Sequence, residues 1–193
     1  MASQPKHLLT AQQYLEIEAD STLKHEFYYG EMFDMAGGTV NHALIARNLL
    51  LAVSAKLAGT DCQAIPSDLR LCIDPASHFT YPDMMIICGE IQLLSGRNDT
   101  VVNPVAIFEV LSISTAAHDR GAKFHGYQRI STLREYFLLS QDEVLIEKFE
   151  RQHEGKWLLS NHQGLNALVP VLSTRGEVAL SDIYAGIRFP GAQ

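Results

Sequence analysis

Residues 105–111 read Val-Ala-Ile-Phe-Glu-Val-Leu, an apolar run that carries a single carboxylate, Glu109. A continuous apolar run of this length predicts a strand buried on both faces of a sheet. Residues 83–88, Asp-Met-Met-Ile-Ile-Cys, predict a second such strand, and Asp83 follows directly after Pro82. Interior strands seldom hold charge, because burying an ionised carboxylate is costly unless a cation or hydrogen bonds compensate. Asp83 and Glu109 are therefore the first candidates for a functional site.

The elements around these strands predict an α/β (α+β) fold with a mixed central sheet flanked by helices. Thr39 is a suitable N-cap, and the residues after it are apolar at helical spacing. The order helix, three strands, helix, strand favours one sheet packed between helices. In chain order we expect a helix from Thr39 to about Leu57, a strand from Cys62 to Ile73 interrupted at Pro66, strands at 83–88 and 105–111, a helix from about Ala117 to Ile130, and a strand at 135–139.

Further elements are predicted on both sides of this core. Thr10 and Gln13 match a capping box, which opens a helix through about Ala19. Two short strands around Tyr29-Gly30-Glu31 predict a hairpin at 25–35, and extra C-terminal strands are predicted at 144–149, 156–159 and 169–171. No repeat, low-complexity tract or linker divides the 193 residues, so we expect a single domain, 1–193, with its core at about 39–140.

The composition, with 47% hydrophobic and 19% charged residues, is that of an ordinary globular protein. No apolar run reaches the roughly 18–20 residues that a membrane span needs, and no hydrophobic signal core follows the first charges. We therefore expect a cytoplasmic protein that has no membrane partner. The three cysteines, Cys62, Cys72 and Cys88, lie far apart among apolar neighbours, which favours buried free thiols over disulfides.

A formal net charge of −7 argues against a protein that coats DNA through a broad basic surface. It leaves open an enzyme that grips phosphates through a local patch. One segment, from His118 to Arg134, holds four bases and one acid, Asp119. On charge alone, such a segment is better interpreted as the solvated face of a helix.

If the strands that carry Asp83 and Glu109 are neighbours, their carboxylates converge at one edge of the sheet. A pair of oxygen ligands with open positions is how proteins usually hold Mg²⁺ or Mn²⁺ together with several waters. Lys123, one helix later, can bring an ammonium to the same edge, where it could orient water or stabilise charge on a phosphate. The sequence has no Gly-x-Ser-x-Gly elbow, zinc-ligand spacing or phosphate-binding Gly-rich loop to suggest another chemistry.

Three motifs together resemble the Uma-two family, whose members are candidate endonucleases of the restriction-endonuclease-like PD-(D/E)xK superfamily. The motifs are Tyr81-Pro82-Asp83, then residues 103–112 around Glu109, then Asp119-Arg120-Gly121-x-Lys123-Phe124-x-x-Tyr127. The resemblance extends from about Thr10 to Phe149. It implies the superfamily core of helix, three strands, helix and strand, the same order that the elements predict.

The resemblance also implies roles for residues. Asp83 and Glu109 would be metal ligands, for Mg²⁺ or Mn²⁺, and DNA would be the substrate. The superfamily lysine belongs two residues after Glu109, where this chain has Leu111, so Lys123 is the candidate. Many relatives carry an acid on the first core helix; here the nearest substitute is Glu31. By the same analogy, two subunits cutting two strands would make the protein a homodimer.

Each residue also has a structural interpretation. Asp83 could be a turn residue at a strand start, and Lys123 could pair with Asp119 on an exposed helix face, a pairing worth only about 0.2–0.5 kcal/mol. His42 could cap the helix start or contact a phosphate there. Tyr127 could position Lys123 or a substrate, or could be half-buried packing.

Three functional hypotheses follow. The first is a metal-dependent endonuclease that hydrolyses DNA, with Asp83, Glu109, Lys123 and Glu31 as its site. The second is a catalytically inactive module on the same fold that binds nucleic acid or another partner. The third is a metal-dependent hydrolase of small phosphodiesters or nucleotides.

Overall fold

The computed structural model describes residues 8–35, 37–112 and 115–189, and its centre is a six-stranded mixed sheet. The strands lie in the order β11-β10-β9-β8-β6-β3. Only β8 and β9 are parallel in this sheet; its other neighbouring strands are antiparallel. Their bounds are β3 Cys62–Pro66, β6 Met84–Cys88, β8 Ala106–Val110, β9 Glu135–Leu139, β10 Leu145–Arg151 and β11 Trp157–Gln163.

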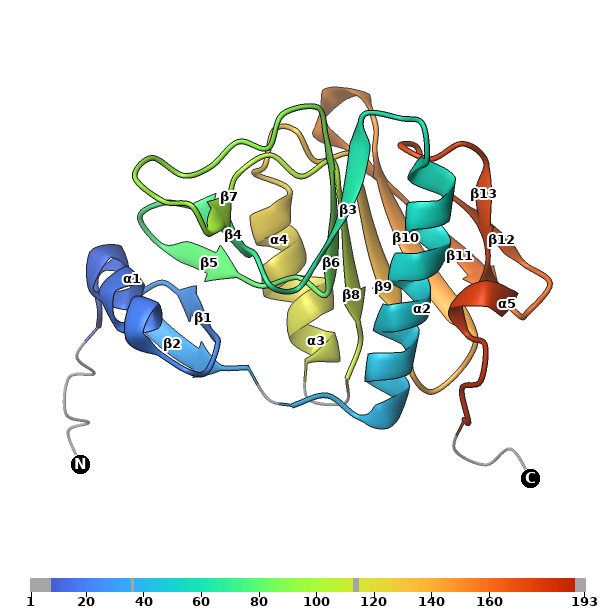
Figure 1. Cartoon of the computed structure of the whole chain (residues 1–193), viewed down its shortest axis with the longest axis horizontal. Helices are drawn as coiled ribbons and strands as arrows, with labels where there is room; N and C mark the ends of the chain where they lie inside the picture. The colour runs from blue at the N-terminus through green and yellow to red at the C-terminus, as the bar shows by residue number, and fades with distance from the viewer. Residues whose placement is uncertain (1–7, 36, 113–114, 190–193) are drawn as a thin grey trace.

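Helices cover both faces of this sheet, as Figure 1 shows with the sheet edge-on between them. Helix α2 (Val40–Leu57) packs Ile45, Leu49 and Val53 against one face. The opposite face is covered by a continuous helical segment made of α3 (Ala116–His118), a π-helical turn η1 (Asp119–Lys123) and α4 (Phe124–Tyr127). Since side chains alternate along a strand, even-numbered residues of β6 and β8 face α2 and odd-numbered ones face α4.

A second sheet, in the order β2-β1-β5-β4-β7, lies with α1 (Ala11–Asp20) at the N-terminal side of the molecule (Figure 1). Its small core is formed by Tyr14, Phe27, Cys72 and Phe79. The strand bounds are β1 His25–Tyr28, β2 Glu31–Asp34, β4 Arg70–Asp74, β5 His78–Thr80 and β7 Thr100–Val101. The C-terminal part adds the β12–β13 pair (Leu168–Pro170 and Glu177–Ala179) and α5 (Leu180–Ile183).

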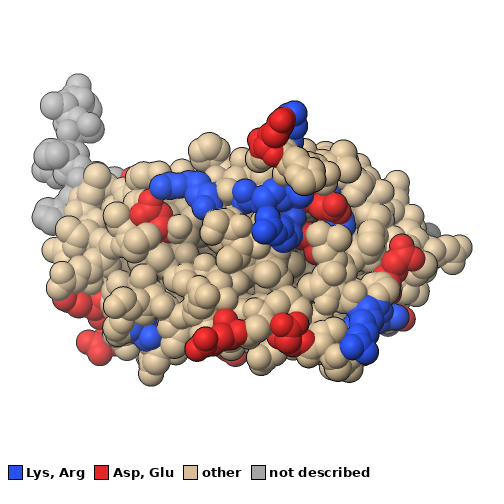
Figure 2. Space-filling view, turned by 90° about the horizontal axis from the view of Figure 1, so that it is seen from above, with Lys and Arg blue, Asp and Glu red and all other residues tan. Residues whose placement is uncertain are grey.

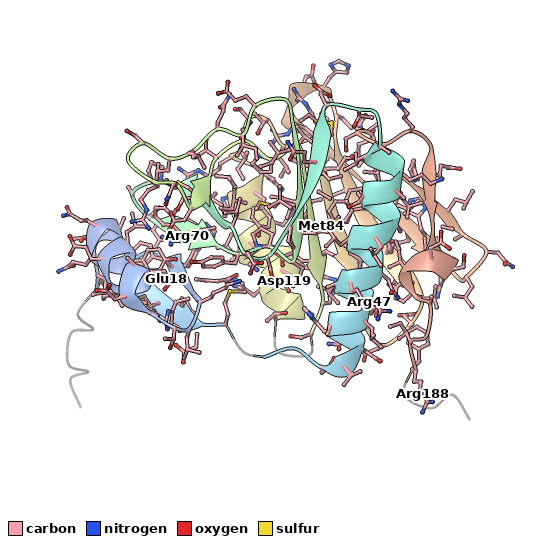
Figure 3. All side chains as sticks on the ribbon, in the orientation of Figure 1. Glu18, Arg47, Arg70, Met84, Asp119 and Arg188 are labelled. Carbon is pink, nitrogen blue, oxygen red and sulfur yellow. A yellow bond between two sulfur atoms is a disulfide. The ribbon has the colours of Figure 1, made fainter. Side chains whose placement is uncertain are left out.

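A buried hydrogen-bonded chain links the second sheet to the start of β6. The Tyr81 hydroxyl donates to Glu18 Oε1 at 2.8 Å and accepts from Arg70 Nε at 2.9 Å. Figure 3 shows Glu18 and Arg70 in this N-terminal layer. Tyr81 precedes Asp83 by two residues, so this chain of bonds holds the entry to β6 in place.

The predicted order of elements is confirmed, and the capped helices at Thr10 and Thr39 begin where expected. The predicted strand from Cys62 to Ile73 is instead two strands, since β3 joins the central sheet and β4 joins the second one. The short elements β5, β7, β13 and α5 were not predicted, because segments of two to four residues show little periodicity. The predicted helix from Ala117 to Ile130 ends at Tyr127 and contains the π turn.

The prediction of three free thiols is wrong for two of them. Cys62 and Cys88 form a disulfide, whereas Cys72 is free and buried. The reason is the β3–β6 register, which places Cys62 directly opposite Cys88 although 26 positions separate them in the chain. Their spacing in the sequence therefore did not reveal their neighbourhood in the sheet.

The charged side chains are interspersed on the face that Figure 2 shows. Lys and Arg side chains lie beside Asp and Glu among uncharged residues and form no continuous basic field there. Among the helices of the described residues, none combines the length and the apolar character that crossing a membrane requires.

Candidate active site

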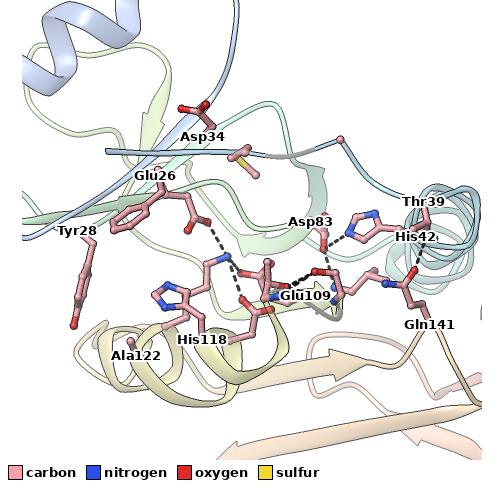
Figure 4. Close-up of a pocket in the computed structure, with 18 residues that line it drawn as sticks. Glu26, Tyr28, Asp34, Thr39, His42, Asp83, Glu109, His118, Ala122 and Gln141 are labelled. Atoms are coloured by element: carbon pink, nitrogen blue, oxygen red, sulfur yellow. Dashed lines mark hydrogen bonds and ion pairs between the residues drawn. The ribbon is translucent and has the colours of Figure 1, made fainter. Parts of the chain in front are cut away.

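A pocket of about 880 Å³ lies where the β1–β2 hairpin, the N-terminus of α2, the adjoining ends of β6 and β8, and the helical segment around η1 meet. Figure 4 shows the side chains that line it. The pocket holds the acids Glu26, Asp34, Asp83, Glu109 and Asp119. Lys123 is the single Lys or Arg among the lining residues that the structure describes.

Asp83 and Glu109 reach this pocket because of the β6–β8 register. Met84 pairs with Phe108, and the next position outward brings Asp83 beside Glu109. Both acids are odd-numbered, so both lie on the face that α4 covers. Asp83 Oδ2 accepts a hydrogen bond of 2.7 Å from the Val110 backbone N–H, which ties the start of β6 to β8.

Asp83 also contacts the first turn of α2. His42 Nε2 lies 3.3 Å from Asp83 Oδ2. The Thr39 hydroxyl caps the same turn by accepting a hydrogen bond from the His42 backbone N–H at 3.1 Å. This bond fixes the backbone position from which the His42 side chain extends. The hydrogen bond to Asp83 raises the pKa of His42 above its ordinary value despite partial burial. His42 thus joins the site through a carboxylate partner.

Glu109 is buried and receives two donors on one oxygen. Lys123 Nζ lies 2.9 Å from Glu109 Oε1, and the Tyr127 hydroxyl donates to the same oxygen at 2.6 Å. Tyr127 is fully buried. Two donors on one oxygen hold the carboxyl group in a single orientation. Tyr127 is therefore more than a packing residue, because its hydroxyl bonds to Glu109.

Lys123 lies among three carboxylates. Its ammonium is 2.7 Å from Glu26 Oε1, 2.9 Å from Glu109 Oε1 and 3.5 Å from Asp119 Oδ1. The side chain is 7% exposed, and Asp119 is also buried. The exposed surface pair that Lys123 and Asp119 could have formed is therefore excluded, although the two residues do form an i,i+4 contact inside the protein.

The local helix geometry supports this arrangement. Asp119 and Lys123 are the first and last residues of the π turn η1. A π turn widens the helix by one residue, and such turns are frequent at functional sites. Tyr127 follows one turn later on α4, so one helical segment supplies three side chains to the same carboxyl cluster.

Burial sets the protonation of the cluster. Desolvation raises the pKa of Glu109 to about 8, against the opposing effect of Lys123 and with a further contribution from the charges of Asp119, Asp83 and Glu26. The pKa of Glu26 is lowered, because contacts with Lys123 and Thr80 outweigh its desolvation. The pKa of Lys123 lies well above its ordinary value, since the three acids outweigh its burial. Lys123 is therefore an ammonium at neutral pH.

The structure brings Asp83, Glu109, Lys123, His42 and Tyr127 together but places Glu31 elsewhere. Glu31 pairs with Tyr28 at the turn end of the hairpin and is not among the residues that line the pocket. Glu26 and Asp34 are the hairpin acids that line it, and Glu26 is the one that contacts Lys123; its place in an ordinary alternating strand offered no signal. Asp119 stood in one of the quoted motifs but was interpreted only as a helix-surface partner.

Asp83 and Glu109 are the residues of the pocket that could hold a divalent cation together with several waters. Among the described residues, Asp83 Oδ1 and Glu109 Oε2 have no hydrogen-bond partner, because the protein uses only the other oxygen of each group. The acids that line the pocket outnumber its single ammonium, Lys123. The pocket does not bring three protein ligand atoms within 4.8 Å of one another; in the described part of the chain, only Asp61, Cys62 and Cys88 do so, at the far end of β6. A two-carboxylate site of this kind suits Mg²⁺ or Mn²⁺.

Known proteins resemble this chain over most of its length. The Uma2 family model, described as "Putative restriction endonuclease", matches residues 11–181. An uncharacterized protein of Synechocystis, slr1290, is 33% identical over 189 residues, which cover 97% of each chain. A second one, sll1609, is 35% identical over 160 residues, which cover 83% of this chain and 90% of the relative.

A solved structure shares the fold. The crystal structure of "a putative nuclease belonging to DUF820" from Anabaena variabilis superposes with a TM-score of 0.74 at 17% identity, and the match covers 92% of this chain and 98% of that chain. At this identity the likeness concerns the fold, and it confirms the predicted mixed sheet flanked by helices.

Proposed function

This chain belongs to the Uma2 family, and from that premise we propose that it is a metal-dependent nuclease that hydrolyses DNA phosphodiester bonds in the pocket around Asp83 and Glu109. The observation that carries the proposal is the pair of carboxylate oxygens, Asp83 Oδ1 and Glu109 Oε2, that have no partner in the described protein and share one face of the sheet. Asp83 and Glu109 would hold Mg²⁺ or Mn²⁺. When bound, the cation would polarise a phosphoryl oxygen and acidify a bound water.

The protein's own groups have distinct tasks. The Tyr127 hydroxyl and the Lys123 ammonium both bind Glu109 Oε1 and keep the carboxyl group in one orientation. The position of its second oxygen, Oε2, is therefore fixed. Asp83 is held by the Val110 N–H and His42. Lys123 bears a fixed positive charge beside these groups, and it can stabilise the charge that develops on a phosphate. Tyr127 acts through Glu109 and is a positioning residue.

The charges that line the pocket favour binding of a cation over binding of an anionic substrate. The acids Glu26, Asp83 and Asp119 outnumber Lys123, so without a cation the pocket disfavours a phosphate. A divalent cation would reverse the local sign of charge at the place where the phosphate has to lie. The proposal therefore requires that DNA binding at this pocket depend on the metal.

The test is cleavage of DNA by purified protein with Mg²⁺ or Mn²⁺, compared with the same reaction in EDTA. We expect metal-dependent cleavage that Asp83→Asn abolishes. Asp34→Asn is the matched control, because Asp34 lines the same pocket, is 83% exposed and forms an ion pair of 3.5 Å with His25. Wild-type protein that binds metal but cuts neither single- nor double-stranded DNA would contradict the proposal and favour the inactive binding module.

A further inference from the structure

One wall of the pocket is aromatic, and it comes from the β1–β2 hairpin. Along β1, Phe27 points into the core with Tyr14 and Phe79, while Glu26 and Tyr28 line the pocket. Phe33 pairs with Glu26 on β2 and therefore lies on the same side of the hairpin as Tyr28. The Phe33 side chain is 47% exposed although it lines a pocket. A large exposed aromatic next to a carboxylate cluster offers a flat apolar surface to a ligand.

The ring of Tyr28 is held in place by the ring of Tyr29, edge-on at 4.7 Å, and by two imidazoles. It meets His78 edge-on with ring centroids 4.8 Å apart, and it meets His118 edge-on at 6.2 Å. Burial lowers the pKa of His78 to about 4, so this neighbour is an uncharged ring at neutral pH. Figure 4 shows Tyr28 and Glu26 on one side of the view and His42, Thr39 and Gln141 on the other, with Asp83 and Glu109 between them. The aromatic wall thus lies beside the carboxylates and does not block them.

The spacing from this wall to the charged groups suits one nucleotide. Glu26 lies two residues before Tyr28 on the same strand face, a separation of about 7 Å. Glu26 in turn contacts Lys123 at 2.7 Å, and Lys123 contacts Glu109. A nucleotide can span such a distance between its phosphate and its base.

Two observations argue against a duplex at this site. The reactive carboxylates are recessed, since the side chains of Glu109 and Asp83 are only 6% and 16% exposed. A phosphate therefore has to reach into the pocket, which a flexible single strand does more readily than a stiff duplex. Duplex binding also draws on many phosphate contacts from Lys and Arg, and Lys123 alone supplies such a charge among the described lining residues.

Building on the proposed function, we propose that the substrate is single-stranded DNA, with one base stacked on Tyr28 and Phe33 and the adjoining phosphate at Asp83, Glu109 and Lys123. Aromatic stacking is how proteins bind single strands without reading their sequence, because every base has a flat face. The hairpin is therefore the part of the molecule that selects the substrate's strandedness.

The test measures binding separately from cleavage. Fluorescence anisotropy of a labelled oligonucleotide is recorded in Ca²⁺, as a single strand and annealed to its complement, and a gel of each sample shows that the DNA is intact. Replacing one base by 2-aminopurine reports stacking through the quenching of its fluorescence. We expect the single strand to bind at least about tenfold more tightly than the duplex. Tyr28→Leu should weaken this binding by about 5- to 150-fold.

Two further variants supply the controls. Phe33→Leu changes a residue that is 47% exposed and lies outside the buried core, so it tests stacking with little effect on folding. Leu158→Ala is the control, because Leu158 is 58% exposed on β11 and does not line the pocket; we expect unchanged affinity. Equal or tighter binding of the duplex, or unchanged single-strand affinity in Phe33→Leu, overturns this inference. If duplex is also cleaved, the proposed function survives; if DNA of neither form is bound or cut, both fail together.

Discussion

Asp83 and Glu109 lie side by side at the end of the β6–β8 ladder, one position beyond the pair formed by Met84 and Phe108. The Val110 N–H donates to the Asp83 carboxylate across the same junction. Two carboxylates so placed repel each other in a recessed site. The arrangement costs stability unless a cation is bound, and function and stability conflict at such places.

Glu109→Gln should reduce metal-dependent cleavage by at least about 100-fold, because a metal–oxygen contact supplies several kcal/mol of transition-state stabilisation. Its thermal stability without metal should be unchanged or raised, since the amide replaces a buried carboxyl group whose charged form is disfavoured by desolvation, and Lys123 keeps Glu26 and Asp119 as partners. Cleavage assays and thermal melts in EDTA check this prediction. A variant that does not fold would instead indicate that the carboxylate has a structural role.

Lys123→Gln should destabilise the metal-free protein by about 3–5 kcal/mol, because it leaves three carboxylates together without their buried counter-charge. Mg²⁺ or Mn²⁺ should then raise the melting temperature of this variant more than that of the wild type, since the cation takes over the missing positive charge. Thermal melts across a metal titration measure both effects. Lys156→Gln, which removes an exposed ammonium paired with Glu154, is the control and should melt like the wild type.

Tyr127→Phe should lower turnover by about 10- to 100-fold, as expected when a group that orients a ligand is lost. The hydroxyl that donates to Glu109 at 2.6 Å would be missing, while the ring would remain in the core. Metal affinity should fall together with the rate, and calorimetry with Mn²⁺ measures it. Tyr136→Phe removes the hydroxyl of another buried tyrosine, which donates to the Asp119 backbone carbonyl; its effect on metal affinity should be smaller.

Metal affinity should rise with pH up to about 8. In the metal-free protein burial raises the pKa of Glu109 to about 8, so its carboxyl group is protonated below that value. A cation binds the deprotonated group and must displace the proton, which weakens apparent affinity by up to about tenfold for each pH unit below 8. Calorimetric Mn²⁺ titrations at several pH values test this dependence. In Glu109→Gln the pH dependence of metal affinity should be absent. The window from about pH 5 to 8 lies roughly between the ordinary pKa of a glutamate and the raised pKa of Glu109, so a wild-type metal affinity that is flat across it would contradict the prediction.

His42 should report on the occupancy of the pocket. Its pKa is raised by the hydrogen bond to Asp83, so a cation that competes for Asp83 should lower it. NMR titration of the His42 ring with and without Mg²⁺ measures this shift. Asp83→Asn should lower the pKa of His42 without any metal, whereas Asp34→Asn should leave it unchanged. If the pKa of His42 responds neither to Mg²⁺ nor to Asp83→Asn, Asp83 is not the group that both His42 and the cation contact.

The apolar runs, the helix caps and the family motifs in the sequence were enough to predict the central sheet, its helices and two acids of the site. A carboxylate inside residues 105–111 and another at the start of residues 83–88 singled out Glu109 and Asp83, because burial makes an unpaired charge costly. The Thr39 cap and the order of elements predicted the central sheet and its helices, since these signals are local and depend on a few neighbouring residues. Lys123 was a candidate from its place one helix after Glu109, and the resemblance supported it, but its burial was not predicted, because a lysine on a helix has no pattern that separates burial from exposure.

Tertiary structure alone decided which distant residues became neighbours. The β1–β2 hairpin brought Glu26 and Tyr28 to a helix about 95 positions later and left Glu31 outside the pocket lining. The β3–β6 register joined Cys62 to Cys88, and the π turn directed Asp119 and Lys123 inward. Strand register and helix orientation are set by packing between whole elements. No stretch of sequence carries that information locally, so the pocket's charge balance could be determined only from the folded chain.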